Sequence, residues 1–103
     1  MSTDEHYESK YLAQVKSAAL EVFSGGRIFL FGSRARGSYR RSSDYDIAVA
    51  GLESAEFSRR RGRFLELLEE SLVPHDADVV NFDELDEEFR KRIDGEKVEW
   101  TNG

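Results

Sequence analysis

Three short segments with strand patterning, set between segments with helical spacing, constrain the fold of this chain most strongly. The strand-like segments lie at residues 27–31, 44–50 and 76–82. Apolar residues spaced by three or four positions predict long helices over residues 3–24 and 54–72, the second with Leu72 on its buried face, and a shorter helix after Asp83. Residues 98–100 can add a terminal strand. This order predicts a small α/β (α+β) sandwich with a mixed sheet of three to four strands flanked by helices.

Composition bounds the classes of function. A length of 103 residues is expected to form one domain spanning residues 1–103. The net charge of −6 disfavours direct nucleic-acid binding as the main role. The chain has no cysteine, which excludes thiolate metal sites and a cysteine nucleophile. It also has no apolar run of membrane-spanning length and no signal-like start, so we expect a cytoplasmic protein without a membrane partner.

The charge is unevenly distributed along the chain. Residues 24–43 contain five arginines and no acidic residue, within a chain that is acidic as a whole. This basic stretch could be a solvated loop, but it could also form a local site for an anion such as a polyphosphate. The four arginines at positions 59–61 and 63 lie among acids on a predicted helix, and we expect them to be solvated or to face a partner.

The first predicted strand ends in residues suited to bind phosphate. Gly32 allows the backbone to approach a ligand closely, because it has no Cβ. Ser33 offers a hydroxyl group, and the N–H groups after it begin a helical turn that could bind an anion. Arg34 and Arg36 follow directly, and guanidinium groups match the oxygens of phosphate.

The second predicted strand begins with two carboxylates on one face. Asp44 and Asp46 alternate with the apolar residues Tyr45, Ile47 and Val49, which should form ordinary core on the opposite face. Carboxylates two residues apart on a strand can share a pair of divalent ions, and Mg²⁺ prefers such oxygen ligands together with substrate phosphates. The same spacing without a metal would bring two negative charges into mutual repulsion.

A third carboxylate is expected from the third strand. Asp76 and Asp78 fall on the same face of that strand, and both remain candidates. Asp78 is preferred because apolar residues flank it, which predicts burial and therefore a need for a metal or another strong partner. Close to a metal it could also accept the proton of an attacking hydroxyl.

The segments Phe31–Gly37 and Ser43–Ile47 together resemble the Gly-Ser-x10-Asp-x-Asp signature of the polymerase-β-like nucleotidyltransferases. Within that superfamily the chain is most similar to the minimal nucleotidyltransferases, which include MntA-type antitoxins. The resemblance implies ATP as substrate and two Mg²⁺ ions held by Asp44 and Asp46, with Asp78 as third ligand or base. It also implies that Gly32 and Ser33 hold the triphosphate.

The same resemblance implies a reaction and a partner. Minimal nucleotidyltransferases of this kind transfer AMP to a tyrosine of a small helical HEPN-domain toxin, whose acceptor site would be supplied in trans. Two alternatives stay open: an adenylyltransferase for a small-molecule hydroxyl, and a non-catalytic antitoxin that acts by binding alone.

Overall fold

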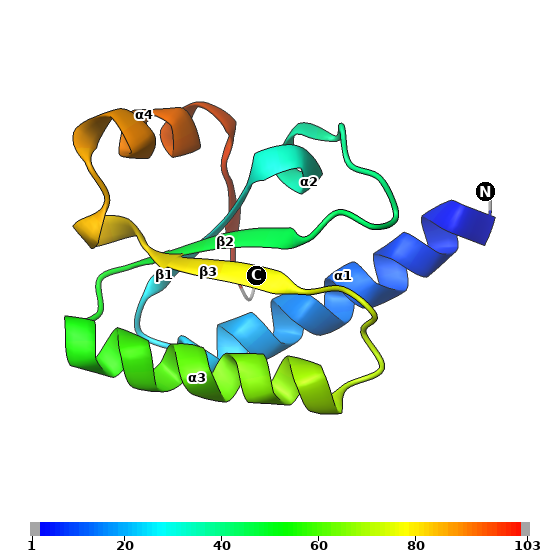
Figure 1. Cartoon of the computed structure of the whole chain (residues 1–103), viewed down its shortest axis with the longest axis horizontal. Helices are drawn as coiled ribbons and strands as arrows, with labels where there is room; N and C mark the ends of the chain where they lie inside the picture. Colours follow the sequence, from blue (N-terminus) through cyan, green and yellow to red (C-terminus); the bar gives the residue numbers. More distant parts are fainter. Residues whose placement is uncertain (1–2, 102–103) are drawn as a thin grey trace.

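A four-stranded mixed sheet forms the centre of the computed structural model, which describes residues 3–101, with side chains from residue 10 onward (Figure 1). The strand order is β3-β2-β1-β4, with β1 antiparallel to both of its neighbours and β2 parallel to β3. The predicted mixed α/β sheet is therefore confirmed. The strands are β1 (Arg27–Phe31), β2 (Tyr45–Ala50), β3 (Ala77–Asn81) and β4 (Val98–Trp100).

Helices cover both faces of the sheet. Two long helices lie together on one face, and a shorter helix covers the other face (Figure 1). The long pair are α1 (Thr3–Val22) and α3 (Ser54–Glu70), and the shorter one is α4 (Glu87–Glu96). Between them come a single helical turn after β1, α2 (Gly32–Arg36), and a 3₁₀ turn, η1 (Phe82–Glu84). Because α3 joins two parallel strands, it serves as the crossover helix between β2 and β3.

The sheet separates two apolar clusters. The larger cluster packs α1 and α3 against one face and includes Tyr45, Ile47 and Val49, each at most 1% exposed, so their predicted place in the core is confirmed. The smaller cluster lies on the α4 side and contains Phe29, Phe31, Ala48 and Ile93. Because side chains alternate along a strand, the position two before Ala48 shares the α4 face. That position is occupied by Asp46, which belongs to the candidate site.

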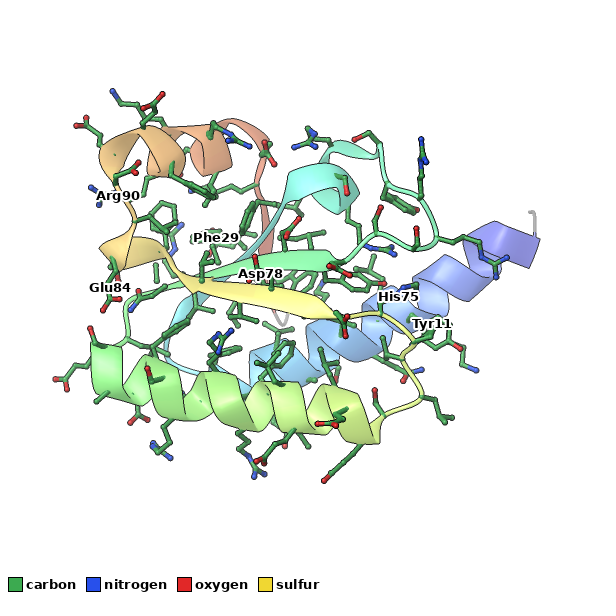
Figure 2. The ribbon with its side chains drawn as sticks, in the orientation of Figure 1. Tyr11, Phe29, His75, Asp78, Glu84 and Arg90 are labelled. Carbon is green, nitrogen blue, oxygen red and sulfur yellow. The ribbon has the colours of Figure 1, made fainter. Side chains whose placement is uncertain are left out.

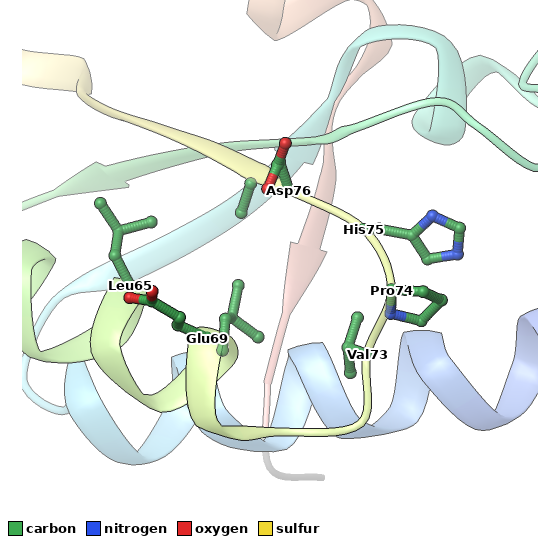
Figure 3. Close-up of a pocket in the computed structure, with 8 residues that line it drawn as sticks. Leu65, Glu69, Val73, Pro74, His75 and Asp76 are labelled. Carbon is green, nitrogen blue, oxygen red and sulfur yellow. The ribbon is translucent and has the colours of Figure 1, made fainter.

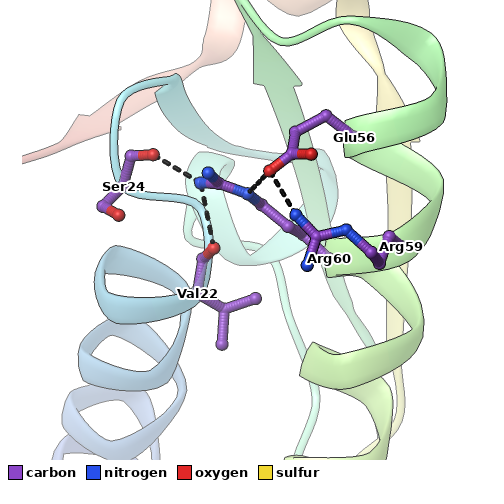
Figure 4. Close-up of polar contacts among 5 residues, drawn as sticks. All are labelled: Val22, Ser24, Glu56, Arg59 and Arg60. Atoms are coloured by element: carbon purple, nitrogen blue, oxygen red, sulfur yellow. Dashed lines mark hydrogen bonds and ion pairs between the residues drawn. The ribbon is translucent and has the colours of Figure 1, made fainter.

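Of the four arginines on α3, Arg60 is partly buried, so its expected solvation was wrong, whereas the other three are exposed as expected. Arg60 Nη1 donates to the carbonyl oxygens of Ser24 at 2.5 Å and Val22 at 3.3 Å (Figure 4). These carbonyls lie at the end of α1, where helical partners are missing, so the guanidinium satisfies them. Arg61 Nε likewise donates to the carbonyl oxygen of Val79 at 3.0 Å. Both contacts join segments far apart in sequence, which local charge patterns do not reveal.

Candidate active site

The turn at Gly32 lies directly against the carboxylate of Asp46. The β1–β2 register pairs Phe31 with Asp46, and the chain leaves β1 one residue later. Gly32 has a φ of +74°, a left-handed conformation that side chains rarely adopt. A Cβ at this position would also collide with a carboxylate oxygen of Asp46. Glycine is therefore required here for two reasons, its backbone conformation and its close approach to an acid.

Asp46 and Asp78 face each other across adjacent strands. The parallel register pairs them directly, and strand neighbours lie about 4.8 Å apart. Both side chains lie on the α4 side, where they line a cavity of about 380 Å³ together with Ser33 and Arg36. Figure 2 shows Asp78 on that side of β3, as it also shows Phe29 on β1. The structure thus brings two of the predicted acids to the predicted Gly-Ser turn.

Asp78 is exposed, so its predicted burial was wrong. The reason is that β3 lies at the edge of the sheet, where no further strand covers it. Asp76, the alternative third carboxylate, precedes β3 and lines a different pocket at the end of α3 (Figure 3). Its carbonyl oxygen accepts the N–H of Tyr45 at 3.0 Å, which ties the starts of β2 and β3 together. The geometry therefore favours Asp78 over Asp76 as the acid that accompanies Asp46.

The electrostatics of the cavity favour a bound cation. Burial raises the pKa of Asp46, and the negative charges of Asp78, Asp44 and Glu96 raise it further, while the positive charge of Arg36 acts in the opposite direction. Asp44 is exposed and lies one residue before β2, so it acts from the rim rather than from the cavity wall. The ionised form of Asp46 is thus disfavoured as the site stands, and a cation would relieve this cost.

The donor set fits Mg²⁺ in part. Among residues 10–101, whose side chains are described, no three histidine, cysteine or acidic residues come close enough to form a ready-made metal site. Mg²⁺ nevertheless binds through one or two carboxylates completed by water and substrate phosphates. Asp46 and Asp78 supply such a pair of oxygen ligands beside the turn that would hold the phosphates.

The two arginines of α2 lie in different surroundings. Arg36 lines the cavity, and its Nη1 lies 3.0 Å from a carboxylate oxygen of Glu96. Arg34 is buried; its Nε donates to the carbonyl oxygen of Ser43 at 2.9 Å, and its guanidinium carbon lies 4.1 Å from the centre of the Tyr45 ring. The structure thus uses Arg34 to hold the connection between α2 and β2. The predicted contact between Arg34 and a phosphate is not favoured by this arrangement, because the guanidinium already contacts the Ser43 carbonyl and the Tyr45 ring.

Sequence reasoning missed two charged residues of α4 that line this cavity, Arg92 and Glu96, and Glu96 makes the closer contacts with the Gly32 turn. Its carboxylate accepts the N–H of Gly32 at 2.5 Å and pairs with Arg36. It is the last residue of α4, in a segment so rich in acids that charge alone did not single it out. One signal was available: a terminal strand that pairs antiparallel with β1 brings the residues before it to the end of β1, where Gly32 lies.

Comparison with known proteins assigns the family. Residues 21–99 match the family model described as polymerase beta, nucleotidyltransferase. The Haemophilus influenzae protein named probable protein adenylyltransferase MntA is 31% identical over 86 residues, covering 84% of this chain and 75% of the relative. The chain belongs to the polymerase beta nucleotidyltransferase family.

Solved structures agree with this assignment. A structure assigned to a minimal nucleotidyltransferase has a TM-score of 0.65 and 28% identity, covering 91% of this chain and 92% of its own. A Shewanella oneidensis complex of a tri-AMPylated HEPN toxin with its MNT antitoxin has a TM-score of 0.60 and 15% identity, covering 92% and 72% of the two chains. Within its family, this nucleotidyltransferase is thus of the minimal, MntA-like type. No helix in residues 3–101 is long and apolar enough to cross a membrane.

Proposed function

We propose that this protein is an antitoxin of a HEPN-type toxin. Its cleft transfers AMP from ATP to a tyrosine hydroxyl of that toxin. The observation that carries the proposal is the convergence of Asp46 and Asp78 on the Gly32–Ser33 turn in one cavity. Carboxylates beside a phosphate-binding turn are what an enzyme needs to hold cations under a polyphosphate. The name of the MntA relative and the AMPylated toxin in the similar complex support protein AMPylation as the reaction.

The residues predicted for the site have proposed roles. Asp46 and Asp78, with Asp44 at the rim, would hold two Mg²⁺ ions, which neutralise charge on the reacting phosphates when bound. The N–H of Gly32 and the hydroxyl of Ser33 would bind the triphosphate. In this proposal Arg36 adds positive charge at the cavity wall. Arg34 holds the connection between α2 and β2 in place.

The proposed chemistry is an in-line displacement at the α-phosphorus. The tyrosine oxygen forms a bond to the α-phosphorus, the bond from that phosphorus to the bridging oxygen breaks, and pyrophosphate leaves. The tyrosine proton passes to the carboxylate of Asp78, which faces the cavity from an exposed edge strand. We propose that residues 1–103 act as one catalytic domain. Catalysis then depends mainly on positioning and on charge.

Intact mass spectrometry of both chains tests the proposal. The protein is incubated with ATP, Mg²⁺ and the product of the neighbouring gene, which the proposal expects to be a HEPN-type protein, and this partner should gain the mass of one or more AMP groups. The variant Asp46→Asn should abolish this gain. The matched control is Asp76→Asn, which changes the same charge on an acid that lines the other pocket, and it should retain transfer.

Two other results would each replace the proposal by an alternative. Tight complex formation with no mass change on the partner would favour a non-catalytic antitoxin. ATP consumption with AMP attached to a small-molecule hydroxyl, and none on the partner, would favour a small-molecule adenylyltransferase.

A further inference from the structure

Glu96 contacts groups at which the proposed nucleotide site would bind an anionic phosphate. Its carboxylate accepts the N–H of Gly32 at 2.5 Å and lies 3.0 Å and 3.2 Å from Arg36 Nη1. The Glu96 side chain is only 17% exposed, while that of Arg36 is 48% exposed. Glu96 also lines the same cavity as Asp46 and Asp78. A third carboxylate therefore enters the cleft, and it contacts a backbone donor and a cation there.

Of the two donors that Glu96 contacts, the N–H of Gly32 is assigned above to the triphosphate, and Arg36 supplies positive charge in the same cavity. Carboxylate and phosphate oxygens are bound by the same kinds of group, backbone N–H and guanidinium, with similar distances and angles. The single N–H of Gly32 cannot donate at full strength to two anions. A phosphate that approached this N–H with Glu96 in place would also meet a negative charge at close range, in a partly buried cavity where screening is weak.

We infer that Glu96 occupies the position of a nucleotide phosphate and competes with it, so that a triphosphate binds only when the Glu96 carboxylate leaves Gly32. This inference rests on the proposed function, because it assumes that the Gly32 turn binds phosphate. In the protein without nucleotide, Glu96 satisfies the Gly32 N–H and holds α4 against α2. When a triphosphate takes over the donors, the last turn of α4 loses this attachment.

The test is binding of inorganic tripolyphosphate, without any metal, to the full chain by isothermal titration calorimetry. The variant Glu96→Gln removes the competing charge and keeps the side-chain volume. It should bind tripolyphosphate about tenfold more tightly than the wild type, which is the scale of one charge-assisted hydrogen bond.

A matched variant separates competition from net charge. Asp94→Asn changes the charge by the same amount two residues earlier, at an exposed side chain paired with Lys97. It should change the affinity less than twofold if competition at Gly32 is the cause. Equal tightening in both variants would mean that net charge alone acts, and would overturn the inference. Weaker binding by Glu96→Gln would also overturn it, because Glu96 would then support the bound anion.

Hydrogen exchange supplies a second readout. Ligands normally slow amide exchange where they bind, yet tripolyphosphate should speed exchange in the last turn of α4 while slowing it at the Gly32 turn. Slower exchange in both places would contradict displacement of Glu96. If neither the wild type nor Glu96→Gln binds tripolyphosphate, and neither binds ATP in the presence of Mg²⁺, the proposed function fails as well. If both proteins bind with equal affinity and AMP transfer proceeds, only this inference fails.

Discussion

Replacing Gly32 by alanine tests the central geometry of the site. The φ of +74° makes alanine strained by about 1–2 kcal/mol in the folded state. The new Cβ would also collide with the Asp46 carboxylate, which must then rotate away from its preferred conformation at a further cost of about 0.5–1.5 kcal/mol. We expect Gly32→Ala to lose about 2–3 kcal/mol of unfolding free energy. For a chain of this size, that loss lowers the melting temperature by roughly 10–20 °C.

Gly37 provides the control for this prediction. It has a φ of +80°, and a Cβ there would meet no atom within 4 Å. Gly37→Ala should therefore lose only the backbone part, about 1–2 kcal/mol. In an Asp46→Ala background, the loss caused by Gly32→Ala should fall to the same value, because the colliding group is gone. Urea denaturation measures all of these proteins. The reasoning is refuted if Gly32→Ala costs no more than Gly37→Ala, or if its extra cost persists without the Asp46 carboxylate.

Three further predictions concern other parts of the structure. Asp46→Asn should leave the metal-free protein as stable or more stable at neutral pH and should abolish its stabilisation by Mg²⁺-ATP, both read by thermal unfolding. Burial raises the pKa of Asp46, so the folded protein holds the proton of this carboxyl more tightly than the unfolded chain does. The wild type should therefore gain stability relative to this variant as the pH falls through the raised pKa toward the ordinary value of 3.8. A loss of relative stability over the same pH range would contradict a raised pKa for Asp46. Arg34→Lys should lose about 1–2 kcal/mol in urea denaturation, whereas weaker ATP binding at unchanged stability would assign Arg34 to the phosphates after all. Arg60→Ala should lose about 1–2 kcal/mol of unfolding free energy. The control is Arg59→Ala, since the Arg59 side chain is 71% exposed and pairs with the same glutamate, and it should change stability by less than about 0.5 kcal/mol. Equal effects of the two variants would exclude a stabilising role of Arg60 at the end of α1.

Local signals in the sequence predicted most of the fold. Strand alternation placed Tyr45, Ile47 and Val49 in the core, and helical spacing found α1 and α3. The turn at Gly32 and the acids of β2 could be found because their residue types and spacing are properties of a short segment. The end of α3 was placed too late, since the helix stops at Glu70 and Leu72 is 83% exposed. A helical periodicity does not show where the last turn stops packing.

Contacts that form only in the folded chain account for what the sequence did not reveal. Asp78 was expected to be buried because its neighbours are apolar, but its exposure depends on the order of the strands. Arg34 belongs to a basic stretch, yet its guanidinium fits between a ring and carbonyl groups of the following loop. Glu96 reaches Gly32 across 64 positions. Each of these outcomes depends on which groups the folded chain brings close together, and residue type alone does not determine it.

The most direct test of the account is a crystal structure of the protein with Mn²⁺ in place of Mg²⁺ and a non-hydrolysable ATP analogue. Anomalous scattering from manganese then gives the position of each ion. The account predicts manganese bound between the carboxylates of Asp46 and Asp78, with the triphosphate at the N–H of Gly32. Manganese bound to the triphosphate alone, with neither carboxylate as a ligand, or a nucleotide seated in the pocket beside Asp76, would contradict it.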